Sequence, residues 1–174
     1  MTDLLQVFEE NAGPLFRFAY RLTGSAADAE DIVQECFLAL LKPNRSYNPQ
    51  QTPLRTYLFG AVRNQALKRL REREKIGEAH TIDGHFKGHS PEAEAARTEL
   101  GDAVARAVRQ LPETQRAALI LAHYEQMSLA EIAEVLTIEV AAVKSRLQRG
   151  RAALKEILAA YAPAAEPNDV EKQP

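Results

Sequence analysis

The segment SLAEIAEVLTIEVAAVKSRLQRGRAALKEIL, from Ser128 to Leu158, predicts two helices separated by a short turn. Ser128 and Glu131 have the spacing of a capping box, so we expect a short helix that starts here and runs through Leu136. A turn over residues 137–139 precedes a longer helix. A short helix, a tight turn and a second helix form a helix-turn-helix. The apolar side of the second helix consists of Val143, Leu147, Gly150, Leu154 and Leu158.

The second helix of this motif carries polar side chains that could read DNA. In a helix-turn-helix, the N-terminal part of this helix enters the major groove, where Lys, Arg, Gln and Ser pair with base edges or phosphates. An α-hairpin with a basic face is the alternative. Thr137 stands where the turn usually has glycine, so either Thr137 is left-handed or the turn has a different shape. The recognition set is Lys144, Ser145, Arg146, Gln148, Arg149 and Arg151.

A second basic segment, PLRTYLFGAVRNQALKRLREREK, extends from Pro53 to Lys75 in a chain whose net charge is only -2. We expect one helix with Thr52 as its N-cap and Pro53 at its first position. One narrow sector of this helix offers an aromatic ring, an amide and three cations, which suits contact with phosphates and bases. A basic surface that merely keeps the domain in solution is the alternative. This basic sector comprises Tyr57, Asn64, Lys68, Arg71 and Lys75.

Two helices are predicted upstream of the basic segment. The first runs from Leu4 to Leu22, with a break or restart at Pro14, and Ser25 caps the second. The apolar face of the second helix contains Ala29, Ile32, Val33, Cys36, Phe37 and Leu40. A second stripe on that helix is either a solvated face or a docking face for another protein. This mixed stripe comprises Asp31, Gln34, Glu35, Leu38 and Leu41.

Residues 76–90 interrupt every periodicity and predict a flexible linker, so we expect an all-α fold of two small helical domains. The domains span residues 1–75 and 91–160, with the helix-turn-helix in the second and a disordered tail over 161–174. Further helices are expected from Ser90 to Leu111 and from Pro112 to about His123. The histidines of the linker have no fixed scaffold, so we expect neither a metal nor a cofactor. These histidines are His80, His85 and His89.

The composition excludes several classes of protein. Hydrophobic residues make up 45% of the chain and charged residues 26%, and no apolar run approaches the roughly 20 residues of a membrane helix. The acidic N-terminus lacks the features of a secretory signal, and Cys36 is the only cysteine. No nucleophile–base pair or phosphate-binding glycine loop is present, which argues against an enzyme. We therefore expect a cytoplasmic, non-enzymatic protein without membrane insertion.

Three segments, in this order, resemble the extracytoplasmic-function sigma factors of the sigma-70 family. These segments are DAEDIVQECFLAL from Asp28 to Leu40, RTYLFGAVRNQALKRLR from Arg55 to Arg71, and LPETQRAALILAHYEQMSLAEIAEVLTIEVAAVKSRLQRGRAAL from Leu111 to Leu154. The resemblance covers nearly everything from residue 4 to residue 160. It implies a sigma factor that binds core RNA polymerase and directs promoter-specific transcription initiation, and the two domains would be sigma domain 2 and sigma domain 4.

The resemblance also implies roles for individual residues. Asp31, Gln34, Glu35 and Leu38 would bind the clamp coiled coil of the largest polymerase subunit. The basic sector, with the loop from Asn44 to Thr52, would receive the minus-ten element and an unstacked base, while the recognition set would read the minus-thirty-five element. An anti-sigma factor is an expected partner. Tyr57 replaces a common tryptophan and Ala142 a common threonine, which leaves base specificity open.

Two other functions are compatible with parts of this sequence. One is a sigma mimic that sequesters an anti-sigma factor, although such mimics carry a fused receiver domain and no βα repeat is present to supply one. The other is a helix-turn-helix transcriptional regulator with an N-terminal effector domain, which would leave the basic sector unexplained.

Overall fold

The computed structural model describes residues 3–43, 47–77 and 99–160. Within these residues the chain forms seven α-helices and no β-strand, arranged as two helical domains, which confirms the predicted all-α fold. No helix in the described ranges has the length and apolar character needed to cross a bilayer. The predicted linker histidines and the tail lie outside the described residues.

The N-terminal domain consists of α1 (Leu4–Thr23), α2 (Ala26–Leu41) and α3 (Leu54–Ile76), which pack against one another. The rings of Phe18 and Phe59 meet in its core, with their centroids 5.3 Å apart. The predicted break at Pro14 is wrong, because α1 continues through this residue. Proline removes one backbone hydrogen bond, but Leu15 and other buried side chains on both sides of it hold the helix in place.

The predicted N-cap is confirmed for α2 and is wrong for α3. Ser25 caps α2 as predicted, because its Oγ accepts a hydrogen bond of 3.2 Å from the Asp28 N–H. Thr52, however, does not cap α3. The Thr52 N–H donates to the Asn48 carbonyl, so Thr52 belongs to the preceding turn, and Pro53 occupies the N-cap position without a side-chain cap.

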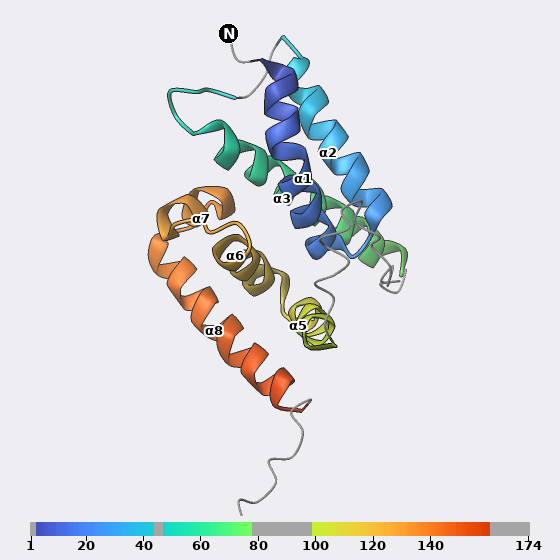
Figure 1. Cartoon of the computed structure of the whole chain (residues 1–174), viewed down its shortest axis with the longest axis vertical. Helices are drawn as coiled ribbons and strands as arrows, with labels where there is room; N and C mark the ends of the chain where they lie inside the picture. The colour runs from blue at the N-terminus through green and yellow to red at the C-terminus, as the bar shows by residue number, and fades with distance from the viewer. Residues whose placement is uncertain (1–2, 44–46, 78–98, 161–174) are drawn as a thin grey trace, which may run out of the picture.

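The C-terminal domain consists of α5 (Glu99–Gln110), α6 (Glu113–His123), α7 (Leu129–Leu136) and α8 (Val140–Ala159). Its core contains fully buried Ile120, Leu121, Ile132 and Val143. The helices α6 and α7 lie on the side that faces the N-terminal domain, where α6 contacts α1 and α7 contacts α3, and α8 forms the outer side (Figure 1).

The helix-turn-helix begins with the predicted capping box. The Glu131 N–H donates to the Ser128 Oγ at 3.2 Å, and the Ser128 N–H donates to the Glu131 Oε2 at 2.7 Å. These bonds to Ser128 hold the pKa of Glu131 below its ordinary value. The turn contains Thr137 in the left-handed conformation, with φ 55° and ψ 50°. Of the two turn shapes that the sequence allowed, the structure adopts the strained one.

Replacing Thr137 with glycine is expected to raise the free energy of unfolding of the C-terminal domain by about 1 kcal/mol. The side chain of Thr137 is exposed, so the substitution removes backbone strain without opening a cavity. Urea denaturation followed by circular dichroism measures the change. Thr137→Val keeps the β-branch and should give no such gain, and a Thr137→Gly protein less stable than wild type would contradict the account of the turn.

Candidate nucleic-acid interface

The cations of α3 fall into two groups. Four of them lie beside acidic side chains. The remaining three, Lys68, Arg71 and Lys75, are exposed and form no ion pair within the described part of the chain. These three are the cations of the basic sector, so the predicted face is the one left open for an external anion. The paired cations are Arg55 with Glu125, Arg63 with Glu113, Arg69 with Asp28, Asp31 and Glu35, and Arg73 with Asp28.

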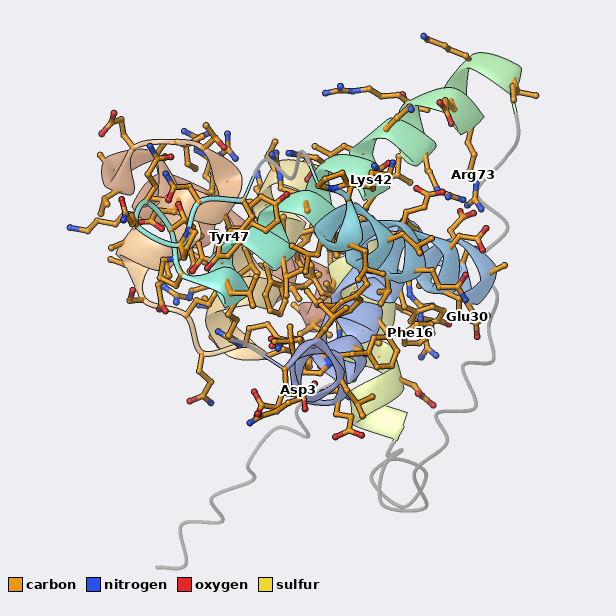
Figure 2. All side chains as sticks on the ribbon, turned by 90° about the horizontal axis from the view of Figure 1, so that it is seen from above. Asp3, Phe16, Glu30, Lys42, Tyr47 and Arg73 are labelled. Carbon is orange, nitrogen blue, oxygen red and sulfur yellow. The ribbon has the colours of Figure 1, made fainter. Side chains whose placement is uncertain are left out.

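The aromatic end of the basic sector is built by two tyrosines. The ring of Tyr57 packs on the ring of Tyr47 from the loop between α2 and α3, with centroids 4.9 Å apart and planes inclined by 46°. Tyr47 and Arg73 lie towards opposite ends of α3 (Figure 2). Sequence reasoning placed this loop near the site but did not single out Tyr47. An aromatic residue in a proline- and asparagine-rich loop was the available signal.

Tyr57 and Asn64 line a cavity of about 450 Å³. This volume lies within the range of small-ligand sites, and the wall combines aromatic, amide and hydroxyl groups. Such a wall can stack on a planar base and hydrogen-bond to its edge. The wall includes Glu35, Thr52, Thr56, Gly60 and Gln65 from the N-terminal domain, and Glu134, Val135 and Thr137 from α7.

The recognition set does not form one uniform face of α8. Four of its members, Lys144, Gln148, Arg149 and Arg151, are exposed. The Oγ of Ser145 accepts a 2.7 Å hydrogen bond from Arg149 Nη2, one turn away, which orients that guanidinium. Arg146 differs from the others, because its Nη1 is buried and makes no hydrogen bond within the described residues.

The charge of Arg146 acts on Arg63 of the other domain. Burial lowers the pKa of Arg63, Glu113 raises it in part, and the charges of Arg146 and Arg71 lower it further. Arg63 Nε lies 3.7 Å from Glu113 Oε1, so the carboxylate beside Arg63 comes from the C-terminal domain. Arg146 therefore differs in its surroundings from the four exposed members of the recognition set.

The mixed stripe of α2 is exposed along its length. Leu38 and Leu41 are 58% and 60% exposed, which is unusual for leucines on a packed helix. Arg69 of α3 reaches Glu35 at 2.8 Å and Asp31 at 3.5 Å, although both carboxylates remain open to solvent. The stripe therefore combines two positioned acids with two leucines, and this composition suits a protein partner with basic and apolar side chains.

The described residues contain no group of three or more His, Cys, Asp or Glu side chains that could hold a metal ion. Cys36 is buried, and burial raises the pKa of its thiol to about 12. The thiol is therefore protonated at neutral pH and is a poor nucleophile.

Comparisons with protein families match both domains. Sigma-70 region 2 matches residues 7–76, and Sigma-70, region 4 matches residues 101–154. The first match contains the mixed stripe and the basic sector, and the second contains the helix-turn-helix and the recognition set.

Individual relatives match most of the chain. It is 26% identical over 170 residues to the ECF RNA polymerase sigma factor SigW of Bacillus subtilis, which covers 90% of this chain and 87% of that one. It is 34% identical over 152 residues to the ECF RNA polymerase sigma factor SigL of Mycobacterium tuberculosis, with coverage of 86% and 85%.

Two solved structures share the fold. The sigma factor RpoE of Bartonella quintana, solved with the anti-sigma factor NepR, aligns with a TM-score of 0.72 and 26% identity over 91% of this chain and 98% of that one. CnrH, solved with the cytosolic domain of CnrY, aligns with a TM-score of 0.68 and 25% identity over 91% and 89%.

Proposed function

This chain belongs to the extracytoplasmic-function sigma factors of the sigma-70 family, the non-enzymatic subunits that direct promoter-specific transcription initiation with RNA polymerase, and we propose how its residues divide that task. Residues 1–75 act as sigma domain 2 and residues 91–160 as sigma domain 4. The observation that carries this assignment is the basic sector. Its three cations form no ion pair with any described residue and continue the line of Tyr57 and Asn64, which border a cavity.

The basic sector receives the minus-ten element while the duplex melts. Lys68, Arg71 and Lys75 follow the phosphates, because no acid in the described part of the chain neutralises them. Tyr57 and Asn64 offer a ring and an amide to an unstacked base. Unstacking costs a few kcal/mol per step, so a pocket that accepts the freed base favours melting at sequences that supply it.

The recognition set reads the minus-thirty-five element in the major groove. Lys144, Gln148, Arg149 and Arg151 are exposed and free to reach DNA, and Ser145 orients Arg149. Arg146 is a further member of this set, and its Nη1 is buried in the free chain. Base edges supply the specificity, and phosphate contacts fix the position of the helix on the duplex.

The residues Asp31, Gln34, Glu35 and Leu38 of the mixed stripe bind the clamp coiled coil of the largest polymerase subunit. Arg69 supports this role from within the N-terminal domain, since it holds Asp31 and Glu35 in position. The protein therefore acts where the polymerase is, in the cytoplasm. An anti-sigma factor is a further proposed partner, because one of the solved structures most like this chain is a complex with such a factor.

Replacing Lys144 with alanine is expected to reduce transcription from a promoter of this sigma factor by about tenfold, because one contact to a base edge or phosphate is lost. Lys144 is exposed, so the fold should be unaffected. Lys155→Ala is the matched control, since Lys155 is an exposed lysine near the other end of α8. Transcription in vitro and binding to core polymerase are measured for both variants. Loss of core binding in Lys144→Ala would contradict the division between the domains.

A further inference from the structure

The first turn of α8 is apolar although it lies at the surface. Val140 is 37% exposed, and Ala141 beside it is exposed as well. The helix contributes to the core through other residues, because Val143, Leu147 and Gly150 are the ones that it buries. Packing therefore does not account for Val140. Valine is also a weaker helix former than alanine, so the stability of the helix does not account for it either.

The start of α8 is the part of the helix-turn-helix that meets base edges. The helix begins beside α7 and runs along the outer side of the domain (Figure 1). In this motif the N-terminal residues of the second helix contact the bases in the major groove. Residues four apart lie on the same face of a helix, so the exposed side chains of Val140, Lys144 and Gln148 follow one another along that face. The face thus offers an apolar group, a cation and an amide in order.

The charges around Val140 narrow the kind of group that it can contact. The first turn of α8 contains no acid, although the start of a helix favours negative charge. It contains no cation either, since the first basic residue of the helix is Lys144. A valine placed against a phosphate or a polar base edge would remove water from that group without replacing its hydrogen bonds. Val140 therefore fits an apolar group on the DNA.

Thymine is the base that offers an apolar group in the major groove. It carries a methyl group at C5, whereas cytosine, adenine and guanine present hydrogen-bonding groups. Glu139, which precedes Val140, is exposed and makes no side-chain cap bond, so its carboxylate is free to accept a hydrogen bond from the amino group of a cytosine instead. A contact of that kind predicts no effect of a methyl group, so an experiment on the methyl group separates the two.

We propose that Val140 reads the C5 methyl group of a thymine in the upstream promoter element, and that the small Ala141 beside it lets the helix approach the bases. Lys144 and Gln148 then face the neighbouring base pairs. The inference rests on the proposed function for the identity of this element as the minus-thirty-five element. Burial of one methyl group between the valine and the base favours thymine by about fourfold. Val140 thereby determines specificity without a hydrogen bond.

The first test measures what the methyl group contributes. Duplex promoters with a randomised upstream element are selected by the holoenzyme, which is the full chain with bacterial core polymerase, and the bound duplexes are sequenced. A thymine should be enriched at a fixed position of the element. The selected duplex is then compared with one in which uracil replaces that thymine, because uracil forms the same base pair and lacks only the methyl group. The wild-type holoenzyme should bind the uracil duplex about fourfold more weakly.

The second test assigns the methyl contact to Val140. In Val140→Ala the preference for thymine over uracil should disappear, and the fold should be unaffected because the side chain is exposed. Lys144→Ala is the control, since it should weaken binding to both duplexes by the same factor and leave their ratio unchanged. A 5-methylcytosine at the same position provides the converse test. The wild type should bind it about fourfold better than cytosine, and Val140→Ala should show no such gain.

The outcomes separate this inference from the proposed function. If no upstream element is enriched, the proposed reading by α8 fails and the role of Val140 fails with it. If an element is enriched but the uracil duplex binds as tightly as the thymine duplex, the reading by α8 stands and methyl recognition is refuted. If Val140→Ala retains the preference for thymine, the methyl group acts through another residue or through the shape of the groove, and the role of Val140 is refuted.

Discussion

Replacing both Tyr57 and Asn64 with alanine is expected to reduce open-complex formation on a duplex promoter by about 100-fold, since a stacked base contributes about 1–3 kcal/mol and a hydrogen-bonding amide is lost as well. Both side chains line the cavity beside the basic sector. Their loss removes the partners of the unstacked base and leaves the phosphate contacts of Lys68, Arg71 and Lys75. Open complexes are counted by permanganate reactivity of unpaired thymines with core polymerase present.

A pre-melted template is the control for this prediction. When the bases are already unpaired, the cost of unstacking is no longer part of the reaction, so the double variant should fall by much less on this template. Folding is checked by thermal denaturation, because the Tyr57 ring also packs on Tyr47. Equal losses on both templates would mean that these residues bind DNA without assisting melting.

Replacing Leu38 with arginine is expected to weaken binding to core polymerase by about 30-fold, which corresponds to the roughly 2 kcal/mol of an interface hot spot. Leu38 is 58% exposed, so the substitution changes the surface without disturbing the core. The arginine replaces a leucine that would make an apolar contact with the polymerase. It also adds a positive charge beside Asp31 and Glu35, whose carboxylates are already paired with Arg69. Binding is measured by the fluorescence anisotropy of labelled sigma factor titrated with core polymerase.

Ile76→Arg provides the matched control, because Ile76 is 72% exposed at the end of α3 and does not belong to the mixed stripe. It should bind core polymerase as the wild type does. Wild-type affinity in Leu38→Arg would exclude the mixed stripe from the polymerase contact, and equal weakening in both variants would show that the effect comes from added charge.

Helical periodicity predicted the buried face of α2 residue by residue. The predicted apolar face of α2, from Ala29 to Leu40, is buried in full, and the mixed stripe is exposed in full. Side chains on one helix face share one environment, so a pattern with a period of 3.6 is enough to separate core from surface. The same reasoning placed the capping box at Ser128, because its two hydrogen bonds join residues three apart in the sequence.

Features that depend on tertiary contacts could not be predicted in this way. Pro14 breaks a helix only when nothing else holds the chain, and here Leu15 and Phe18, which follow it in α1, are buried. Thr52 has the right chemistry for a cap, but it bonds within the preceding turn. The pairing of Arg55 with Glu125 joins residues 70 positions apart, and no local pattern indicates it.

The basic segment shows both the strength and the limit of sequence reasoning. Counting its cations gave a single charge cluster, whereas the helical wheel separated out Lys68, Arg71 and Lys75. The structure shows why the separation matters, since Arg55, Arg63, Arg69 and Arg73 lie beside acids. The helical wheel could not show that the partners of Arg55 and Arg63, which are Glu125 and Glu113, come from the C-terminal domain.

The most direct test of the central claim is transcription in vitro with the purified chain, bacterial core polymerase and a library of promoter-like duplexes, followed by sequencing of the transcripts. We expect initiation at sites that share two spaced elements, one read by the recognition set and one received by the basic sector. Transcripts that start without such shared elements, or no initiation together with no binding to core polymerase, would contradict the assignment of these two surfaces.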